Sequence, residues 1–375
     1  MARPIAYVDA VEVEAYDAIL DVRSPSEYAQ DHVPGAVNLP VLNDEERHEV
    51  GVLYKQADPF TARKRGASIV ARNIGRHVEE RLSDWGRDVR PLVYCWRGGQ
   101  RSGSLALVLA QIGWGVTVLS GGYKRYRRQV IESLESQPSQ FQWIMLGGLT
   151  GTAKTRLLYH LERAGEQILD LEALAHHRGS VLGPYSESQP SQKWFESQLA
   201  LALARFDPSR PVWIESESHR IGEINIPAGL WSTVKGAPTV ILEAPRAERA
   251  RYLLSEYRHF VEFPLHLQAK LAQLEPIHGR PRIAEWQALV AAREWNGLVE
   301  SLLADHYDPR YRRSANRHGR QILHRVRLER LDAETLAHVV DELRAIAPSR
   351  GDREALAHAG DGSEDSPSDR ASSQV

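Results

Sequence analysis

The chain has very few sulfur-bearing side chains and no long apolar run. Cys95 is the only cysteine among 375 residues, so no internal disulfide can form. This fits a reducing compartment, and we expect a cytoplasmic protein. No run of about 18 apolar residues occurs, so no membrane span or membrane partner is expected. The first turns of sequence are broken by acidic side chains and lack the apolar stretch of a secretory signal.

The chain also lacks a strong excess of charge. Its formal net charge is -2, which argues against a uniformly basic nucleic-acid-binding protein and leaves room for local basic patches. Hydrophobic residues make up 42% and charged residues 26%, as in ordinary globular proteins. At roughly 150 residues per domain, the length predicts two domains.

Strand and helix patterns alternate along most of the chain, which predicts parallel sheets and an α/β fold. We expect a first domain over residues 1–130, a polar linker over 131–141 and a second α/β domain over 142–348 whose C-terminal part is helical. Residues 349–375 are rich in Ser, Asp and Gly and are expected to be disordered. The predicted strands that matter most are 91–94, which stops at Cys95, and 143–146, which precedes a glycine-rich turn.

Cys95 opens a loop of sequence CWRGGQR between a predicted strand and a predicted helix. Loop amides and a helix N-terminus favour negative charge at one point, so a thiolate there has a lowered pKa and is nucleophilic. A free cysteine at a strand end is also an ordinary buried core residue, whereas the nucleophile must be reachable from solvent. We predict Cys95 as the catalytic residue. The predicted anion-binding residues are Trp96, Arg97, Gly98, Gly99, Gln100 and Arg101.

The loop alone fits two families. Rhodanese-like sulfurtransferases use such a loop, and phosphatases with Cys, five residues and Arg match the spacing of Cys95 and Arg101. Upstream, DVRSPSEY at 21–28 and HVPGAVNLP at 32–40 closely resemble the rhodanese-homology signature. One phosphatase class shares this fold, so the signature predicts a rhodanese-like domain more firmly than it predicts the reaction.

A second loop, GGLTGTAKT at 147–155, resembles a Walker A phosphate loop between a strand and a helix. Its amides would hold a diphosphate, and the predicted phosphate-binding residues are Gly148, Gly151, Lys154 and Thr155. Thr155 is placed to reach a Mg²⁺ ion if one is bound, and no other metal site is predicted. Ala153 stands where glycine is usual; a positive φ there costs on the order of 1 kcal/mol and argues against ATP hydrolysis. A glycine-rich turn with an exposed lysine is the alternative.

Residues 212–217, VWIESE, resemble a Walker B strand, with Glu215 or Glu217 in the acidic position. An apolar strand that ends in an acid is also common, so this pattern is weak. Together the two patterns predict a P-loop NTPase-like α/β domain.

Two basic clusters are candidate RNA surfaces. Arginines crowd residues 310–330, with Tyr307 and Tyr311 close by. A second cluster lies after the rhodanese-like segment, near Tyr123 and Tyr126, and comprises Lys124, Arg125, Arg127 and Arg128. Guanidinium groups pair with phosphates and aromatic rings stack on bases, although a solvated basic face is the plain alternative. The predicted tRNA-binding residues are Arg310, Arg312, Arg313, Arg317, Lys124 and Arg125.

A rhodanese domain followed by a P-loop domain, with YCWRGG at 94–99 and GGLTG at 147–151, resembles the tRNA 2-selenouridine synthases over about residues 5–345. The resemblance implies that selenium from selenophosphate replaces the sulfur of a wobble 2-thiouridine in tRNA. It further implies an S-geranylated intermediate made from geranyl diphosphate, with Cys95 as nucleophile or selenium carrier. tRNA is the implied partner, and the enzyme that produces selenophosphate is a second candidate.

Two other functions remain open from the residues alone. The first is a thiosulfate-type sulfurtransferase or Cys-x5-Arg phosphatase with an ATPase module. The second is a non-catalytic tRNA-binding protein, in which Cys95 would not be needed.

Overall fold

The computed structural model describes residues 3–177, 188–215, 218–315 and 321–346. Contacts within the chain divide it into two compact units. Unit 1 comprises Met1–Pro138, Glu172–Arg205 and Ser218–Trp231, and unit 2 comprises Ser139–Leu171, Phe206–Glu217 and Ser232–Val375. No helix in these described ranges is long and apolar enough to cross a membrane.

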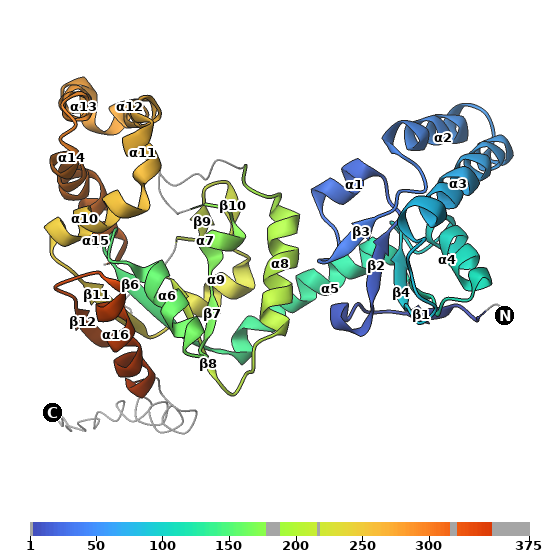
Figure 1. The fold of residues 1–375 in the computed structure, drawn as a ribbon, viewed down its shortest axis with the longest axis horizontal. Coiled ribbons are helices and arrows are strands. Elements are labelled where there is room, and N and C mark those ends of the chain that lie inside the picture. Colours follow the sequence, from blue (N-terminus) through green and yellow to red (C-terminus); the bar gives the residue numbers. More distant parts are fainter. Residues whose placement is uncertain (1–2, 178–187, 216–217, 316–320, 347–375) are drawn as a thin grey trace, which may run out of the picture. The chain divides into compact units, whose positions relative to one another are not determined.

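Unit 1 is built on a five-stranded parallel sheet of order β1-β5-β4-β2-β3 (Figure 1). The strands are β1 (Ala6–Val8), β2 (Ala18–Asp21), β3 (Ala36–Asn38), β4 (Pro91–Tyr94) and β5 (Thr117–Leu119). The helices α1 (Pro25–Gln30), α2 (Asp44–Gln56), α3 (Pro59–Arg81), α4 (Gln100–Ile112) and α5 (Gly122–Ser136) connect and cover them. Ile74 of α3 and Leu105 of α4 lie with sheet residues in one buried cluster, so both helices cover the same sheet.

Two later segments of the chain also fold into unit 1. Helix α8 (Gln192–Ala204) packs against α5, and the hairpin β9 (Arg220–Ile221) and β10 (Ile224–Asn225) packs against α8. An ion pair between Arg127 and Glu196 and a contact of 4.1 Å between the His32 and Trp194 rings join α8 to the rest of the unit. The first compact unit is therefore not continuous in sequence.

Unit 2 contains a second five-stranded parallel sheet, of order β12-β11-β6-β8-β7. Its strands are β6 (Gln142–Gly148), β7 (Gln167–Leu169), β8 (Pro211–Glu215), β11 (Thr239–Glu243) and β12 (Ile322–Arg327). Helices α6 (Lys154–Arg163) and α16 (Ala333–Ile346) contribute leucines to one buried cluster with these strands. The short helices α7 (Leu171–Leu174) and α9 (Ala228–Val234) each span a boundary between the two units.

The helical part of unit 2 lies between β11 and β12 in the sequence. It comprises α10 (Arg246–Glu256), α11 (Arg258–Glu262), α12 (Pro264–Ala272), α13 (Glu275–Ala291), α14 (Trp295–Leu302), a π-helical segment (Leu303–Tyr307) and α15 (Asp308–Ala315). Trp286 and Leu298 are among its fully buried side chains. Gly279, with φ of 77°, and Pro281 break α13 near its start.

The α/β fold with parallel sheets and a helical C-terminal part is confirmed, and the predicted strands at 91–94 and 143–146 correspond to β4 and β6. The predicted domain boundaries agree less well with the structure. Residues 131–136 of the expected linker form the last turns of α5, because Val130 and Leu134 are buried and hold the helix in place. The segments of unit 1 that follow β6 were not expected from the sequence. The expected tail, 349–375, lies outside the described residues.

A buried ion pair ties β2 to the segment that follows it. Arg23 and Asp21 have 1% and 0% of their surface exposed, and Arg23 Nη2 lies 2.6 Å from Asp21 Oδ2 and donates to the Asp31 carbonyl at 2.6 Å. The Arg23 guanidinium also lies 3.9 Å from the Tyr123 ring centroid.

Removing one partner of this pair leaves a buried charge without compensation. Asp21→Ala should therefore lower the free energy of unfolding by about 3–5 kcal/mol in urea titrations. The double variant Asp21→Ala with Arg23→Met should regain most of that loss. An Asp21→Ala protein as stable as wild type would contradict this role of the pair.

Candidate functional site

The first candidate site is the loop that connects β4 to α4. Cys95 follows the last residue of β4, and its sulfur accepts hydrogen bonds from the Gly99 amide and the Ser102 hydroxyl, each at 3.3 Å. Gly98 has φ of 66°, a conformation that glycine adopts without steric cost and that turns the loop back on itself. The first turn of α4 therefore begins beside the sulfur, where its free amides stabilise negative charge.

The pKa of the Cys95 thiol is shifted by two opposing effects. Burial raises it, because an ionised sulfur loses hydration. Hydrogen bonds from the Ser102 side chain and from the amides of Ser102, Arg97 and Gly99 outweigh burial, so the pKa lies below its ordinary value. The thiolate is therefore more populated near neutral pH than in an ordinary cysteine.

The loop is held from outside by the start of α5. The amides of Tyr123 and Lys124 donate to the carbonyls of Cys95 and Trp96 at 2.7 and 3.0 Å. A Cβ atom added to Gly122, which has φ of 58°, would lie 2.2 Å from the Cys95 carbonyl oxygen. Only glycine allows this approach, so the turn after β5 fixes the orientation of the cysteine loop.

Cys95 is less accessible than the sequence interpretation required. Only 3% of its surface is exposed, because the loop folds over the sulfur and Ser102 closes the inner side. Arg97, Gly99 and Gln100 at the rim of the loop are exposed, and Trp96, Gly98 and Arg101 are partly exposed. The expectation of a nucleophile that is open to solvent is therefore wrong.

Arg101 has carboxylate partners of its own. Its Nη1 lies 2.9 Å from Oε2 of Glu27 in α1, and Arg47 Nε lies 3.3 Å from the same oxygen. Burial raises the pKa of Glu27, but hydrogen bonding and charge from Arg101 outweigh it, so the pKa lies below its usual range. In a Cys-x5-Arg phosphatase the arginine has to bind the phosphate, whereas here the Arg101 guanidinium is bound to the Glu27 carboxylate.

The second candidate site is the loop between β6 and α6. Gly148, Gly151 and Ala153 all have positive φ, at 147°, 84° and 60°. Ala153 adopts the left-handed conformation with φ of 60°, which costs about 1 kcal/mol relative to glycine. Lys154 donates from Nζ to the Gly148 carbonyl at 3.1 Å, and Thr155 stands in the first turn of α6. The structure brings all four predicted phosphate-binding residues into one loop and helix start.

The predicted acidic partner lies on the neighbouring strand. Glu215, at the end of β8, is in register with Leu146 of β6, just before the glycines, and is 4% exposed. Parallel strands present their carboxyl ends at one edge of a sheet, which is where ligands bind in such folds. Glu217 lies outside the described residues.

The basic stretch near the C-terminus is only partly available to RNA. Arg310 is exposed and donates to His306 at 3.3 Å, and α15 also carries Arg312 and Arg313, whereas Arg317 lies outside the described residues. Arg325 and Arg327 pair with Glu243 at 2.7 and 3.5 Å. The stretch is therefore not one continuous free surface.

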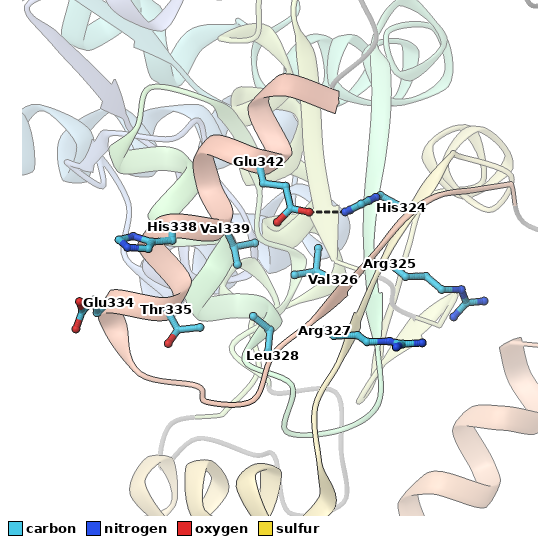
Figure 2. A pocket seen from close by; sticks show the side chains of 10 residues that line it. All are labelled: His324, Arg325, Val326, Arg327, Leu328, Glu334, Thr335, His338, Val339 and Glu342. Carbon is cyan, nitrogen blue, oxygen red and sulfur yellow. Dashed lines mark hydrogen bonds and ion pairs between the residues drawn. The ribbon is translucent and has the colours of Figure 1, made fainter.

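Figure 2 shows Arg325 and Arg327 pointing away from α16, while His324 faces that helix and pairs with Glu342. All four residues line a cavity of about 470 Å³ between β12 and α16. Its lining includes Arg325 and Arg327 of the predicted basic cluster, but none of the predicted catalytic, phosphate-binding or tRNA-binding residues.

The second basic cluster lies on α5. Lys124 and Arg125 are exposed, and Arg125 donates to the Asp9 carbonyl at 3.1 Å. Tyr123 and Tyr126 are 3% and 5% exposed, so the expectation that they stack on bases is wrong. Tyr123 instead donates to Asp31 at 2.6 Å and contacts the Trp96 ring at 5.2 Å. The amphipathic pattern of α5 buries its tyrosines and leaves its lysine and arginine outside.

Sequence reasoning missed several residues that shape the two loops. Ser102 directly follows the CWRGGQR loop but was not assigned to the site, and Gly122 was given no role. Arg249 donates to the Thr150 carbonyl in the phosphate loop at 2.9 Å and pairs with Asp308 at 2.8 Å, and neither residue belongs to a local motif. The glycine pair at 121–122 is the sequence signal that could have indicated a close backbone approach.

The fold and the two loops define a protein in which a rhodanese-like domain is joined to a P-loop α/β domain. Family models agree: the rhodanese-like domain matches residues 7–129, and the tRNA 2-selenouridine synthase AAA domain matches residues 141–276.

Curated relatives extend this similarity over most of the chain. A tRNA 2-selenouridine synthase of Alcanivorax borkumensis is 34% identical over 81% of this chain and 91% of its own length. One from Hydrogenovibrio crunogenus is 40% identical over 64% and 67%, and one from Cupriavidus necator is 33% identical over 89% and 96%. The chain belongs to the tRNA 2-selenouridine synthase family.

The lowered pKa of Cys95 predicts a pH profile for its alkylation. The rate with iodoacetamide should rise with a midpoint below that of an ordinary thiol, because the thiolate is the reacting form. Ser102→Ala removes the side-chain hydrogen bond to the sulfur that lowers the pKa and should move the midpoint upward. Ser104→Ala is the matched control, since Ser104 donates to the Gln100 carbonyl at 2.8 Å and not to the sulfur. Equal midpoints in the two variants would contradict the assignment.

The close approach at Gly122 predicts a large effect of one methyl group. Gly122→Ala should lower the rate of 2-selenouridine formation on tRNA by about 100-fold, since a displacement of about 1 Å in a reacting group has that effect. Gly103→Ala in α4 should leave the rate unchanged, because no atom lies within 4 Å of the added Cβ. Comparable rates in both variants would show that the turn does not position the loop.

Proposed function

We propose that this chain replaces the sulfur of a tRNA 2-thiouridine by selenium and thereby forms 2-selenouridine. The observation that carries this proposal is one cysteine with a lowered pKa, in a rhodanese-like loop, on the same chain as a phosphate loop. Relatives that share this arrangement over most of their length are named tRNA 2-selenouridine synthases. The substrate that this implies is tRNA carrying 2-thiouridine at the wobble position.

The cysteine loop suits selenophosphate as the selenium donor. Selenophosphate is a small anion, and the loop offers amide hydrogen bonds together with the exposed Arg97 at its rim. In this proposal Cys95 is the nucleophile or selenium carrier. The burial of Cys95 adds one requirement, namely that the rim opens when the donor binds. The enzyme that makes selenophosphate is a candidate partner, since direct transfer would shield a reactive donor.

The phosphate loop suits the diphosphate of geranyl diphosphate. The thiouridine sulfur attacks C1 of the geranyl group, the C–O bond breaks, and diphosphate leaves with both bonding electrons. Lys154 and the loop amides stabilise the charge that develops on the diphosphate. The selenium of selenophosphate then bonds to C2 of the base, the C2–S bond breaks, and the geranylated sulfur leaves as a thiolate, a better leaving group than sulfide. Water then takes the phosphoryl group from selenium, so the Se–P bond breaks and phosphate and 2-selenouridine are released. Binding of this substrate needs no nucleotide hydrolysis, and Thr155 is the residue placed to reach Mg²⁺.

The phosphatase alternative is disfavoured by the contacts of Arg101. Its guanidinium is bound to Glu27, where a phosphatase needs it for the phosphate. A general sulfurtransferase or phosphatase would form thiocyanate or release phosphate without tRNA. The protein proposed here should do neither at a comparable rate.

Loss of Lys154 tests the role of the phosphate loop. In a defined mixture of thiolated tRNA and geranyl diphosphate, Lys154→Ala should reduce the geranylated nucleoside by at least about 100-fold, because a charge-stabilising donor is removed. The product is measured by mass spectrometry of the digested tRNA. Lys235→Ala, which changes an exposed lysine of the same unit, is the matched control.

Two outcomes decide this point. Undiminished geranylation with Lys154→Ala would refute the assignment of geranyl diphosphate to the phosphate loop. A loss of geranylation with Cys95→Ala as large as that with Lys154→Ala would show that the two steps do not use separate loops.

A further inference from the structure

The phosphate loop is held by a helix that carries candidate RNA-binding arginines. The Gly148 amide donates to the Tyr311 hydroxyl of α15 at 2.8 Å. The carbonyl of the same residue accepts the hydrogen bond from Lys154. Tyr311 therefore positions Gly148, whose carbonyl accepts the hydrogen bond from the Lys154 ammonium group.

A buried ion pair provides a second support. Arg249 of α10 is 2% exposed and donates to both carboxylate oxygens of Asp308 in α15, at 2.9 and 2.8 Å. Arg249 Nη1 also donates to the Thr150 carbonyl in the phosphate loop at 2.9 Å. Asp308 thus orients the arginine that holds the tip of the loop.

Packing leaves the loop little freedom to move without these helices. A Cβ atom on Gly151 would lie 2.9 Å from the Leu253 side chain of α10. A Cβ atom on Gly147 would lie 2.7 Å from Ile241 and 3.4 Å from the Tyr311 hydroxyl. The shape of the loop and the position of α15 therefore depend on each other.

Helix α15 presents different residues to the loop and to solvent. Asp308 and Tyr311 are three residues apart and share one face, which contacts the loop and Arg249. Arg310 is exposed. A π-helical segment, Leu303–Tyr307, leads into α15, and such segments occur often at functional sites. A polyanion bound to the exposed side acts on the same short helix that supports the loop.

We infer that RNA binding at α15 and diphosphate binding at the phosphate loop are coupled through Tyr311 and the Arg249–Asp308 pair, so that RNA tightens diphosphate binding. RNA phosphates hold α15 in the position that shapes the loop, and the loop then requires less ordering when a diphosphate binds. Linkage makes the effect reciprocal: a diphosphate tightens RNA binding by the same factor. The inference rests on the proposed function, because it takes α15 as an RNA contact and the loop as a diphosphate site.

The sign of the effect distinguishes this coupling from simple electrostatics. Two polyanions that bind near each other repel, so charge alone would make RNA weaken diphosphate binding. Support of the loop by α15 predicts the opposite. The direction of the change is therefore informative even before any variant is made.

The test is calorimetric titration of the full chain with geranyl diphosphate, and separately with inorganic pyrophosphate, with and without a saturating anticodon stem-loop RNA. Wild type should bind both at least about 5-fold more tightly with RNA, the lower end of typical coupling. Tyr311→Phe removes only the hydroxyl and should reduce the ratio to about 2 or less, while affinity for RNA alone stays near wild type. Tyr159→Phe is the matched control, since that hydroxyl donates to Asp170 at 2.6 Å.

A second variant removes the other support of the loop. Asp308→Asn keeps the shape of the side chain and removes the charge that orients Arg249, so it should also reduce the RNA-dependent ratio. An unchanged melting temperature of Tyr311→Phe would show that the smaller effect of RNA on diphosphate affinity does not result from loss of folding.

The outcomes separate the inference from the proposed function. Diphosphate binding that RNA leaves unchanged or weakens overturns the coupling, and so does full coupling in Tyr311→Phe; either result leaves the proposed function standing. Absence of any binding by wild type, with or without RNA, overturns both.

Discussion

The contact between the carbonyl of Cys95 and the start of α5 is the interaction on which the sulfur chemistry depends. The Tyr123 amide donates to this carbonyl at 2.7 Å, and the Lys124 amide donates to the neighbouring carbonyl of Trp96. With both carbonyls turned toward α5, the loop amides are left to point at the sulfur. The lowered pKa of Cys95 is thus a property of two strand–helix turns packed together and does not belong to the cysteine motif alone.

The strands and the two loops could be predicted from sequence because their signals are local. An apolar run that ends at a cysteine or a glycine pair is a pattern contained within about ten residues of sequence. Strands β4 and β6 lie where such runs predict them. The Walker A pattern also marked Ala153 as the position where a positive φ would carry a cost, and the structure has φ of 60° there. Both loops also have the positive-φ glycines that their patterns require.

Features that depend on tertiary packing were not predictable in this way. The burial of Cys95 depends on how the loop folds over the sulfur, and no local pattern encodes this. Tyr123 and Tyr311 were expected to stack on bases because they stand among arginines. In the structure Tyr123 donates a hydrogen bond to Asp31, and the Tyr311 hydroxyl accepts one from the Gly148 amide. The pairing of Arg101 with Glu27 joins residues 74 positions apart. The assignment of α8 to unit 1 is likewise a matter of contacts between distant segments.

In the proposed function the chain combines two ways of stabilising negative charge, one for a thiolate and one for a diphosphate, and Cys95 is the group proposed to handle selenium. Mass spectrometry of tRNA nucleosides tests this most directly, in cells that lack this protein and are supplied with either wild type or Cys95→Ala. Wild type should restore 2-selenouridine, while Cys95→Ala should leave it absent with 2-thiouridine retained. Normal levels of 2-selenouridine with Cys95→Ala would contradict the role of this sulfur.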